Sequence, residues 1–429
     1  MRVLLANSTC KLGGVSTFML SLRRGLVAAG HECDLFFFER GSMEPHLPND
    51  WRIHYGTLAD CMRLVAATRV DVVHANNVDW ATGISAVRRI GAKLIVTAHK
   101  VRDGARCYGW TTANCDSLTA VSDGLRQELA PYTDLPVQVV HSGIDTQMFS
   151  PDGRPHTSPP IVAWVGRSAS LVKRLALLAA AAPALRAAGC RIWVVDQHGA
   201  EQAADLIPDA VATLRPIAEF WGAVPAAQMP ELYRTIAASG GAVVSTSERE
   251  GLGLSLLEAQ ACACLAIGPD VAGVNESVSP RHGCVLYPGD IAPADLAALV
   301  AATLRDRRHT DALRERASEF VREHFSREEM ARQYLRIYRE APFGPAGGAL
   351  ERARRRLRLS PFFNWNAYLE QRWGVGQKQY SASREFLTRG ERRLSAAAAR
   401  EAIRTSPTLY MRPGRLAHLI STSLLPGGI

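Results

Sequence analysis

Two series of short apolar runs, separated by helical patterns, constrain the fold of this chain more than any other feature. The runs read RVLLAN, CDLFFFE, DVVHANN, KLIVTAH, SLTAVS and VQVVH up to residue 141, and IVAWVG, RIWVVD, AVVST, LAIG and CVLY between residues 161 and 287. Several are continuously apolar, as strands are when helices cover both faces of a parallel sheet. With helical stretches between them, such as Val15–Ala29 and Lys173–Ala188, the pattern predicts two doubly wound α/β domains.

Breaks rich in proline and glycine divide the chain, which has 429 residues. This length exceeds one typical core and suits two domains with an appendage. The predicted linker is SPDGRPHTSPP, residues 150–160, and a second break, PFGPAGG, spans residues 342–348. We therefore predict a Rossmann-like domain at residues 1–150, a second with terminal helices at residues 151–342, and a helical or partly disordered extension at residues 343–429.

Cysteine usage and hydropathy indicate the compartment. The nine cysteines are odd in number and include no Cys-x-x-Cys pair, which favours buried free thiols in a reducing compartment over disulfides or zinc. No run approaches the ~20 apolar residues of a membrane span, and the opening MRVLLANSTCKLGG reads as a first strand, not as a signal peptide. We expect a cytoplasmic protein.

The most informative segment for function is STSEREGLGLSLLEAQACA, residues 245–263. It carries two glutamates, Glu250 and Glu258, around a glycine turn at Gly251 and Gly253 that opens a predicted helix. Backbone N–H groups at such a turn and helix start form an anion site. Carboxylates repel phosphate but bind hydroxyls, so the segment suits a phosphate flanked by polyols, as in a nucleotide sugar. The alternative is a tight strand-to-helix connection with two solvated glutamates.

Cations and glycines follow other predicted strands. Arg167 follows IVAWVG and Lys173 opens the next helix, so both can reach the carboxyl edge of the sheet and stabilise a departing nucleoside diphosphate. Gly13 and Gly14 follow the first strand, where backbone N–H groups can face a phosphate. The alternative for Arg167 and Lys173 is that both are solvated basic side chains. The alternative for Gly13 and Gly14 is an ordinary turn between a strand and a helix.

Histidines end three of the runs. His99 ends KLIVTAH, where it can hydrogen-bond a sugar hydroxyl or aid proton transfer, although a structural histidine is the alternative. His74 has a similar position with less support, and His141 is interpreted as structural. The sequence contains no Asp-x-Asp, His-x-x-x-His or EF-hand loop, so we expect no protein-bound metal and no cofactor.

Several motifs occur here in the order of one family, and over residues 1–340 the chain resembles the retaining family 4 glycosyltransferases of bacterial type. The motifs are Gly13-Gly14, DVVHANN, the strand before His99, TAVSDGL, HSGIDTQMF, VGR…K, FWGAV, the spaced E-x7-E, AGVNE, GCVLYPGD and FSREEMARQYLRIY. The resemblance implies a GT-B fold, in which two Rossmann-like domains face a cleft. It also implies a nucleotide-sugar donor and a retained anomeric configuration, and the missing metal motifs predict metal-independent transfer.

The resemblance also implies roles for individual residues. Glu250 would bind the donor sugar, Glu258 the ribose, and Arg167 with Lys173 the diphosphate. His99 would line the sugar pocket. The backbone at Gly253, Leu254 and Ser255 would contact the phosphate and the sugar. Gly13 and Gly14 would lie near the diphosphate. The chain departs from the family pattern at Ser142, Arg174, Ser255 and Cys264, which leaves donor preference and loop shape open.

The basic extension lies outside the resemblance. From residue 343 onward it has 15 Lys/Arg and 5 Asp/Glu, which gives a net charge of +10. Since the whole chain has a net charge of +9, the remainder has a net charge of −1. Residues 352–365 contain the basic run RARRRLRL followed by aromatic residues, a combination that suits an anionic membrane surface. The alternative is a solvated helical extension. No nucleic-acid recognition fold is visible.

Together these patterns predict a retaining hexosyltransferase at the cytoplasmic face of an inner membrane. Its acceptor would be a glycan or lipid-linked molecule in cell-envelope polysaccharide or glycolipid synthesis. A sugar-nucleotide epimerase and a non-catalytic GT-B scaffold in a polysaccharide assembly complex remain as alternatives. No motif reports the nucleotide base, the sugar, the linkage or the oligomeric state.

Overall fold

The computed structural model describes residues 1–77, 82–100, 115–133, 135–168, 170–196, 199–342 and 365–406. The chain forms two compact units. The N-terminal unit contains Met1–Val121, Leu125–Val140 and Ala331–Ile429, and the C-terminal unit contains Ser122–Gly124 and His141–Met330. Within the described residues, no helix combines the length and the apolar character that crossing a bilayer requires.

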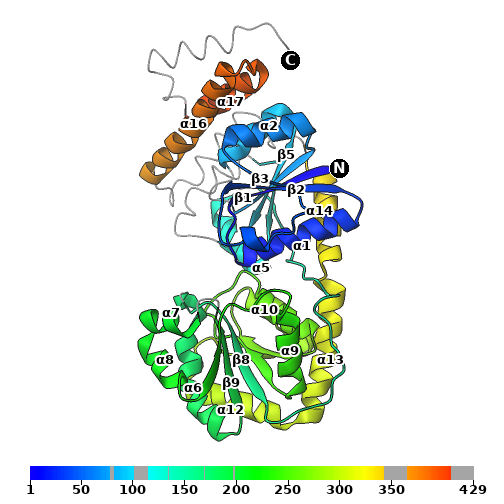
Figure 1. Ribbon diagram of the computed structural model, residues 1–429, viewed down its shortest axis with the longest axis vertical. Helices are drawn as coiled ribbons and strands as arrows, with labels where there is room; N and C mark the ends of the chain where they lie inside the picture. The colour runs from blue at the N-terminus through cyan, green and yellow to red at the C-terminus, as the bar shows by residue number, and fades with distance from the viewer. Residues whose placement is uncertain are drawn as a thin grey trace. The chain divides into compact units, whose positions relative to one another are not determined.

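The N-terminal unit is built on a seven-stranded parallel sheet with the order β3-β2-β1-β4-β5-β6-β7. The strands are β1 (Arg2–Thr9), β2 (Glu32–Glu39), β3 (Ile53–Tyr55), β4 (Val72–Asn76), β5 (Lys93–Ala98), β6 (Ser117–Ala120) and β7 (Val137–Val139). Helices lie on both faces of the sheet (Figure 1), among them α1 (Gly14–Ala28), α2 (Leu58–Thr68), α5 (Asp123–Leu129) and α14 (Arg327–Glu340). The strand order reverses between β1 and β4, which is where open α/β sheets bind ligands.

The C-terminal unit repeats this plan with a six-stranded parallel sheet of order β10-β9-β8-β11-β12-β13. Its strands are β8 (Ile161–Gly166), β9 (Arg191–Asp196), β10 (Ala218–Trp221), β11 (Ala242–Val244), β12 (Leu265–Pro269) and β13 (Val285–Tyr287). Its helices are α6 (Leu175–Ala187), α7 (Gly199–Leu206), α8 (Pro208–Leu214), α9 (Met229–Ala238), α10 (Leu254–Ala261), α11 (Val274–Ser277), α12 (Pro293–Arg305) and α13 (Arg307–His324). The order reverses between β8 and β11.

Burial explains the continuous apolar runs. In β8, Ile161 and Ala163 belong to the core on one face of the sheet, whereas Val162 and Trp164 belong to the core on the other. Successive side chains of a strand point to opposite faces, so a strand covered on both sides is apolar at every position. This confirms two Rossmann-like α/β domains. Eight of the cysteines are buried as free thiols, and the ninth, Cys107, lies outside the described residues.

The units divide the chain differently from the predicted boundaries. The chain enters the C-terminal unit at His141, before the proline-rich segment at residues 150–160, and α14 returns to the N-terminal unit. A buried polar network explains that return: Tyr338 on α14 hydrogen-bonds His74 at 2.6 Å, and Tyr334 hydrogen-bonds Thr97 at 2.9 Å. Burial lowers the pKa of His74 to about 3, so its imidazole is neutral and structural.

The described part of the C-terminal extension is helical. It consists of α16 (Trp365–Thr388) and α17 (Arg392–Thr405), which pack against α2 and the 3₁₀ helix η2 (Thr82–Ile90) of the N-terminal unit. The basic and aromatic segment predicted to meet a membrane, residues 352–365, has its side chains outside the described residues.

Candidate functional site

The candidate site of the C-terminal unit lies in two loops that follow neighbouring strands. Lys173 ends a short 3₁₀ helix, η5 (Leu171–Lys173), after β8, and Glu250 lies in the loop after β11. The ammonium of Lys173 donates a hydrogen bond to the Glu250 carboxylate, and both side chains are mostly buried. The Ser247 hydroxyl donates to Oε1 of Glu250 at 2.7 Å. Two residues predicted to bind the donor therefore meet directly.

Further hydrogen bonds brace these two loops against each other. The Thr246 hydroxyl donates to the carbonyl of Lys173 at 2.7 Å, and the Glu248 N–H donates to the carbonyl of Val172 at 2.7 Å. Trp164 on β8 donates its indole N–H to the Thr246 hydroxyl at 3.0 Å. This bracing fixes the backbone on either side of the Lys173–Glu250 pair, as a preorganised site requires. Sequence reasoning did not identify Ser247 or Thr246.

Arg174 accounts for one departure from the family pattern. It adopts a left-handed backbone conformation, with φ 48° and ψ 47°, that glycine occupies without steric cost. Its guanidinium donates to the carbonyl of Gly289 at 2.8 Å, which anchors the side chain. Helix α6 begins at Leu175, two residues later than predicted, because Arg174 breaks the helical geometry.

The glycine turn leads directly into α10. Gly253 is left-handed, with φ 78°, and precedes the first helical residues Leu254 and Ser255. The first N–H groups of a helix have no intrahelical acceptor, so those of Leu254 and Ser255 are suited to an anion. Gly273 passes so close to the Glu250 carbonyl that a Cβ would collide with it. The AGVNE segment thus holds the backbone of Glu250 from the other side.

Glu258 lies on α10 and is partly exposed. The buried Tyr233, on α9, donates its hydroxyl hydrogen to Oε2 of Glu258 at 3.1 Å. Burial raises the pKa of Glu258 to about 7, and the hydrogen bond from Tyr233 offsets part of that rise. One carboxyl oxygen is therefore oriented by Tyr233, a residue that sequence reasoning missed, and the other has no protein hydrogen bond among the described residues. Arg167 is exposed after β8 and forms no ion pair with any described residue.

A separate group of predicted residues lies at the carboxyl edge of the N-terminal sheet. Gly13, with φ 154°, joins β1 to α1, which begins at Gly14. His99 directly follows β5, contacts Phe18 of α1 edge-on at 4.6 Å, and hydrogen-bonds Asn76 Oδ1 at 3.0 Å. Burial, with Lys100 nearby, lowers the pKa of His99 to about 3. A neutral imidazole can hydrogen-bond a hydroxyl but is poorly suited to carry a proton at neutral pH.

His141 forms contacts that agree with its interpretation as a structural residue. Its imidazole pairs with the Glu276 carboxylate at 3.1 Å. Glu276 also accepts hydrogen bonds from the backbone N–H groups of Asp123 and Gly124, at 2.6 and 2.8 Å, so its carboxylate is satisfied within the C-terminal unit.

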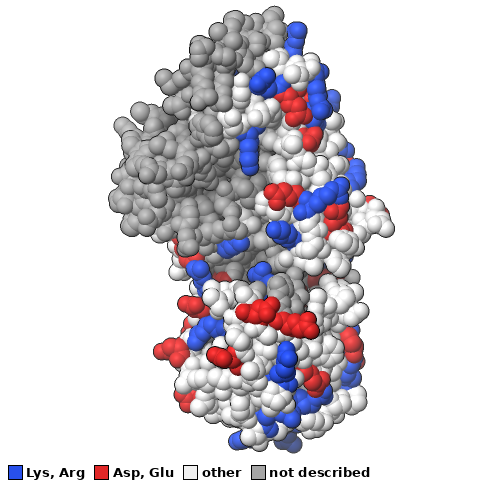
Figure 2. All heavy atoms as spheres, turned by 60° about the vertical axis from the view of Figure 1, so that its left-hand side comes forward, with Lys and Arg blue, Asp and Glu red and all other residues white. Residues whose placement is uncertain are grey.

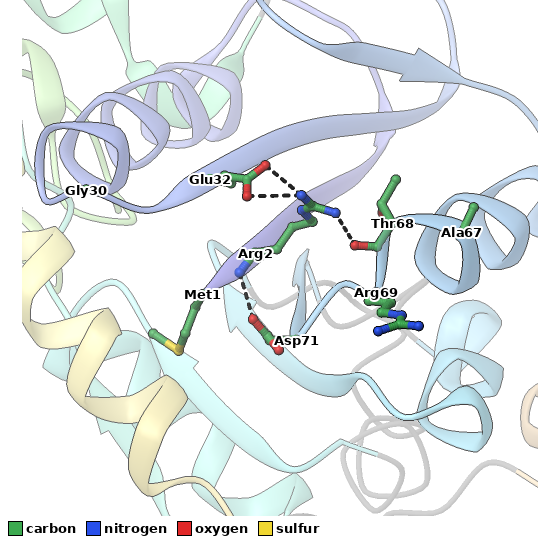
Figure 3. A pocket seen from close by; sticks show the side chains of 8 residues that line it. All are labelled: Met1, Arg2, Gly30, Glu32, Ala67, Thr68, Arg69 and Asp71. Atoms are coloured by element: carbon green, nitrogen blue, oxygen red, sulfur yellow. Dashed lines mark hydrogen bonds and ion pairs between the residues drawn. The ribbon is translucent and has the colours of Figure 1, made fainter.

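A pocket in the N-terminal unit contains none of the predicted residues. It is lined by Met1, Arg2, Gly30, Glu32, Ala67, Thr68, Arg69 and Asp71, at the amino end of β1 (Figure 3). Arg2 donates to Glu32 at 2.9 Å and to the Thr68 carbonyl, and its backbone N–H donates to Asp71 at 2.7 Å. Since this pocket lies at the edge opposite the strand carboxyl ends, it is not the candidate site.

Comparison with known proteins matches most of both units. The model described as "Glycosyltransferase Family 4" matches residues 12–148, and the model "Glycosyl transferases group 1" matches residues 159–306. The chain is 30% identical over 327 residues to the alpha-maltose-1-phosphate synthase of Mycolicibacterium smegmatis, covering 66% of this chain and 82% of that protein.

Two further similarities extend this result. The D-inositol 3-phosphate glycosyltransferase of Segniliparus rotundus is 32% identical over 187 residues, which cover 39% of this chain and 40% of that protein. Among solved structures, Anabaena HepE in complex with UDP and glucose superposes with a TM-score of 0.64 at 17% identity, covering 79% of this chain and 100% of that one. At this identity the structural likeness establishes the fold, which is GT-B.

Proposed function

Because the chain belongs to glycosyltransferase family 4, we propose that it is a retaining enzyme that transfers a hexose from a nucleotide diphosphate sugar to a glycan or lipid-linked acceptor. The observation that carries this proposal is the direct contact between Lys173 and Glu250, beside the start of α10 and Glu258. A cation and an anion on one sheet edge suit a ligand that carries both phosphates and hydroxyls.

Each group has a part in this mechanism. The Glu250 carboxylate accepts hydrogen bonds from hydroxyls of the sugar, and the free oxygen of Glu258 accepts those of the ribose. Lys173 and Arg167 stabilise the charge that develops on the diphosphate as the glycosidic bond breaks, together with the N–H groups at Gly253, Leu254 and Ser255.

The N-terminal unit contributes in two places. The backbone at Gly13 and Gly14 approaches the diphosphate, and the neutral imidazole of His99 hydrogen-bonds a sugar hydroxyl. The resemblance to retaining enzymes of this family supports front-face attack, in which the donor phosphate accepts the acceptor's proton. Protein cations then replace a metal ion, and we expect EDTA to leave transfer unchanged.

The acceptor and the cellular setting are proposed from the composition of the extension and from one relative. The basic extension supports a peripheral position at the cytoplasmic face of an inner membrane, through residues 352–365, and an acceptor in cell-envelope polysaccharide or glycolipid synthesis. One relative is named for inositol 3-phosphate, so a phosphorylated polyol is the second acceptor class to include in an assay.

Single substitutions test the donor site. Glu250→Gln and Lys173→Ala each remove a group that acts on the donor, so we expect transfer to fall by roughly 10²-fold or more, measured as product formed from a panel of nucleotide sugars. The matched controls are Glu248→Gln and Arg249→Ala, since both side chains are exposed in the same loop, and we expect near wild-type rates from them.

Three results would contradict the proposal. Wild-type turnover in the Glu250 or Lys173 variant would show that the pair does not act on the donor. Conversion of the donor without any acceptor would identify an epimerase. Neither transfer nor hydrolysis of any donor would indicate a non-catalytic scaffold.

A further inference from the structure

Charge is segregated across the hairpin of α16 and α17. Between residues 376 and 403, all three acidic side chains face the body of the N-terminal unit. Glu385 and Glu391 both pair with Arg63 of α2, and Glu401 accepts hydrogen bonds from Arg89 at 3.1 Å and from Ser85 at 2.8 Å. The side chain of Glu401 is 1% exposed. Removing the partner of a buried carboxylate is strongly destabilising, so these pairs fix which face of the hairpin points inward.

Between residues 376 and 403, every exposed charged side chain is a cation. Six basic side chains are exposed between residues 376 and 403: Lys378, Arg384, Arg389, Arg392, Arg393 and Arg400. Arg389 lies 3.5 Å from Glu385, and the other five form no ion pair with a described residue. The acidic side chains between residues 376 and 403 pair with Arg63 and Arg89, so they leave these five cations without a counter-charge in this stretch.

Two of these arginines occupy positions that disfavour them. Arg392 and Arg393 begin α17, where the helix dipole is positive and where no acidic residue lies in the first turn. Glu391 is the N-cap residue, but its side chain makes no capping hydrogen bond and pairs with Arg63 instead. Basic residues at the start of a helix go against the preference of the helix dipole. Such an unfavourable placement, without a stabilising contact inside the fold, is typical of a functional surface.

The rest of the protein does not share this imbalance. Outside the extension the net charge is −1, and on the face drawn in Figure 2 basic and acidic side chains are interspersed over the described surface. The cations of the hairpin are therefore a local feature, and they fit a partner with many closely spaced negative charges.

We propose that the outward face of the hairpin, centred on Arg392 and Arg393, docks on an anionic lipid bilayer. No large apolar or aromatic side chain is exposed between residues 376 and 403, so the face has no platform on which bases of single-stranded nucleic acid would stack. The sequence that leads into α16 at Trp365 combines basic and aromatic residues, a composition typical of a bilayer interface. The proposal concerns binding alone and does not depend on the proposed reaction.

Vesicle sedimentation with the full-length protein tests this docking. Binding to phosphatidylcholine vesicles that contain phosphatidylglycerol should exceed binding to pure phosphatidylcholine and should weaken at high salt. Arg392→Gln/Arg393→Gln should lower the partition coefficient roughly 25-fold, because each basic residue near an anionic surface contributes roughly fivefold. This variant should fold normally, since it relieves an unfavourable charge at the start of α17.

The matched control is Arg305→Gln/Arg308→Gln, which removes two exposed arginines from the C-terminal unit and should leave vesicle binding unchanged. Equal binding by the hairpin variant and the wild type would overturn the proposal, as would equal binding to neutral and anionic vesicles. Tighter binding to an RNA oligonucleotide than to anionic vesicles, lost in the hairpin variant, would assign the surface to nucleic acid instead. Donor turnover measured on the same samples tests the proposed reaction independently of vesicle binding.

Discussion

At the scale of single residues, Ser247 links the loop after β11 to the carboxylate of Glu250. Its hydroxyl and the ammonium of Lys173 are the two groups that hold Oε1 of Glu250. The Ser245 hydroxyl lies 3.2 Å from that of Ser247 and forms no hydrogen bond with Glu250 in the described structure. Ser247 is therefore a positioning residue for the proposed donor site.

Ser247→Ala should lower kcat about tenfold and change the donor KM little, because one hydrogen bond that orients a charged group contributes about 1.5 kcal/mol. Ser247→Thr keeps the hydroxyl and should restore most of the rate, and Ser245→Ala should have a smaller effect. Steady-state kinetics on the three variants checks this. An alanine variant that changes only protein yield or melting temperature would show that Ser247 is merely structural.

The raised pKa of Glu258 predicts a pH dependence with a defined sign. Its pKa is about 7 in the folded protein against an ordinary value of 4.5, so the folded state binds the proton more tightly and loses stability as the pH rises from 4.5 to 7. Glu258→Gln should therefore stabilise the protein above pH 7, by about 2 kcal/mol, and should have little effect below pH 4.5. Thermal unfolding across this pH range measures the difference.

Tyr233→Phe provides the directional control. It removes the hydrogen bond that lowers the Glu258 pKa, so the pH-dependent loss of stability should extend to higher pH. An effect of Glu258→Gln that is the same at every pH would contradict the assignment of a titrating carboxyl group at this position.

Sequence patterns indicated Glu250, Glu258 and Lys173 because their spacing around a glycine turn and a strand end is local information. The partners Ser247, Thr246 and Tyr233 could not be predicted in the same way. Their hydrogen bonds depend on which loops the neighbouring strands β8 and β11 bring together, and on how α9 packs beside α10. A lone serine or tyrosine in the sequence carries no signal of such a contact.

At the scale of elements, α2 ends at a residue with an unfavourable backbone conformation. Arg69 is its C-cap residue, with φ 51° and ψ 53°. A non-glycine residue in the left-handed region loses roughly 1 kcal/mol relative to glycine. The Arg69 side chain is exposed and makes no hydrogen bond or ion pair in the described structure.

Arg69→Gly should therefore raise the melting temperature, with a gain in stability of about 0.5–1 kcal/mol. Arg69→Ala is the control, since it removes the side chain without relieving the backbone and should give no gain. Equal effects of the two variants would show that the side chain, not the left-handed conformation, determines the change.

The long central strands were predictable because both faces are buried and every position is apolar. The short edge strands β3 and β10 were not identified. β3 (Ile53–Tyr55) is half-buried throughout, and β10 (Ala218–Trp221) alternates between half-buried and exposed residues. In both cases the hydrophobic pattern is too brief to stand out from a loop, and pairing with β2 or β9 defines the strand.

At the scale of the whole molecule, the extension is part of the N-terminal unit. Arg63 donates to Glu385, Glu391 and Asp60, and Arg89 pairs with the buried Glu401. Composition revealed the positive charge of the extension, but not this docking, because ion pairs between residues more than 300 positions apart leave no local pattern. The return of α14 to the N-terminal sheet, through Tyr334 and Tyr338, escaped prediction for the same reason.

The central claim is that the edge of the C-terminal sheet around Lys173, Glu250 and Glu258 holds a nucleotide sugar, and a thermal-shift panel of nucleotide sugars tests it most directly. At ~100 times its dissociation constant, one donor should stabilise the wild type by about 2.7 kcal/mol. Lys173→Ala and Glu258→Gln should lose this stabilisation, and Glu248→Gln should keep it. A panel in which no nucleotide sugar stabilises the wild type, or in which the Lys173 and Glu258 variants respond as the wild type does, would contradict the account.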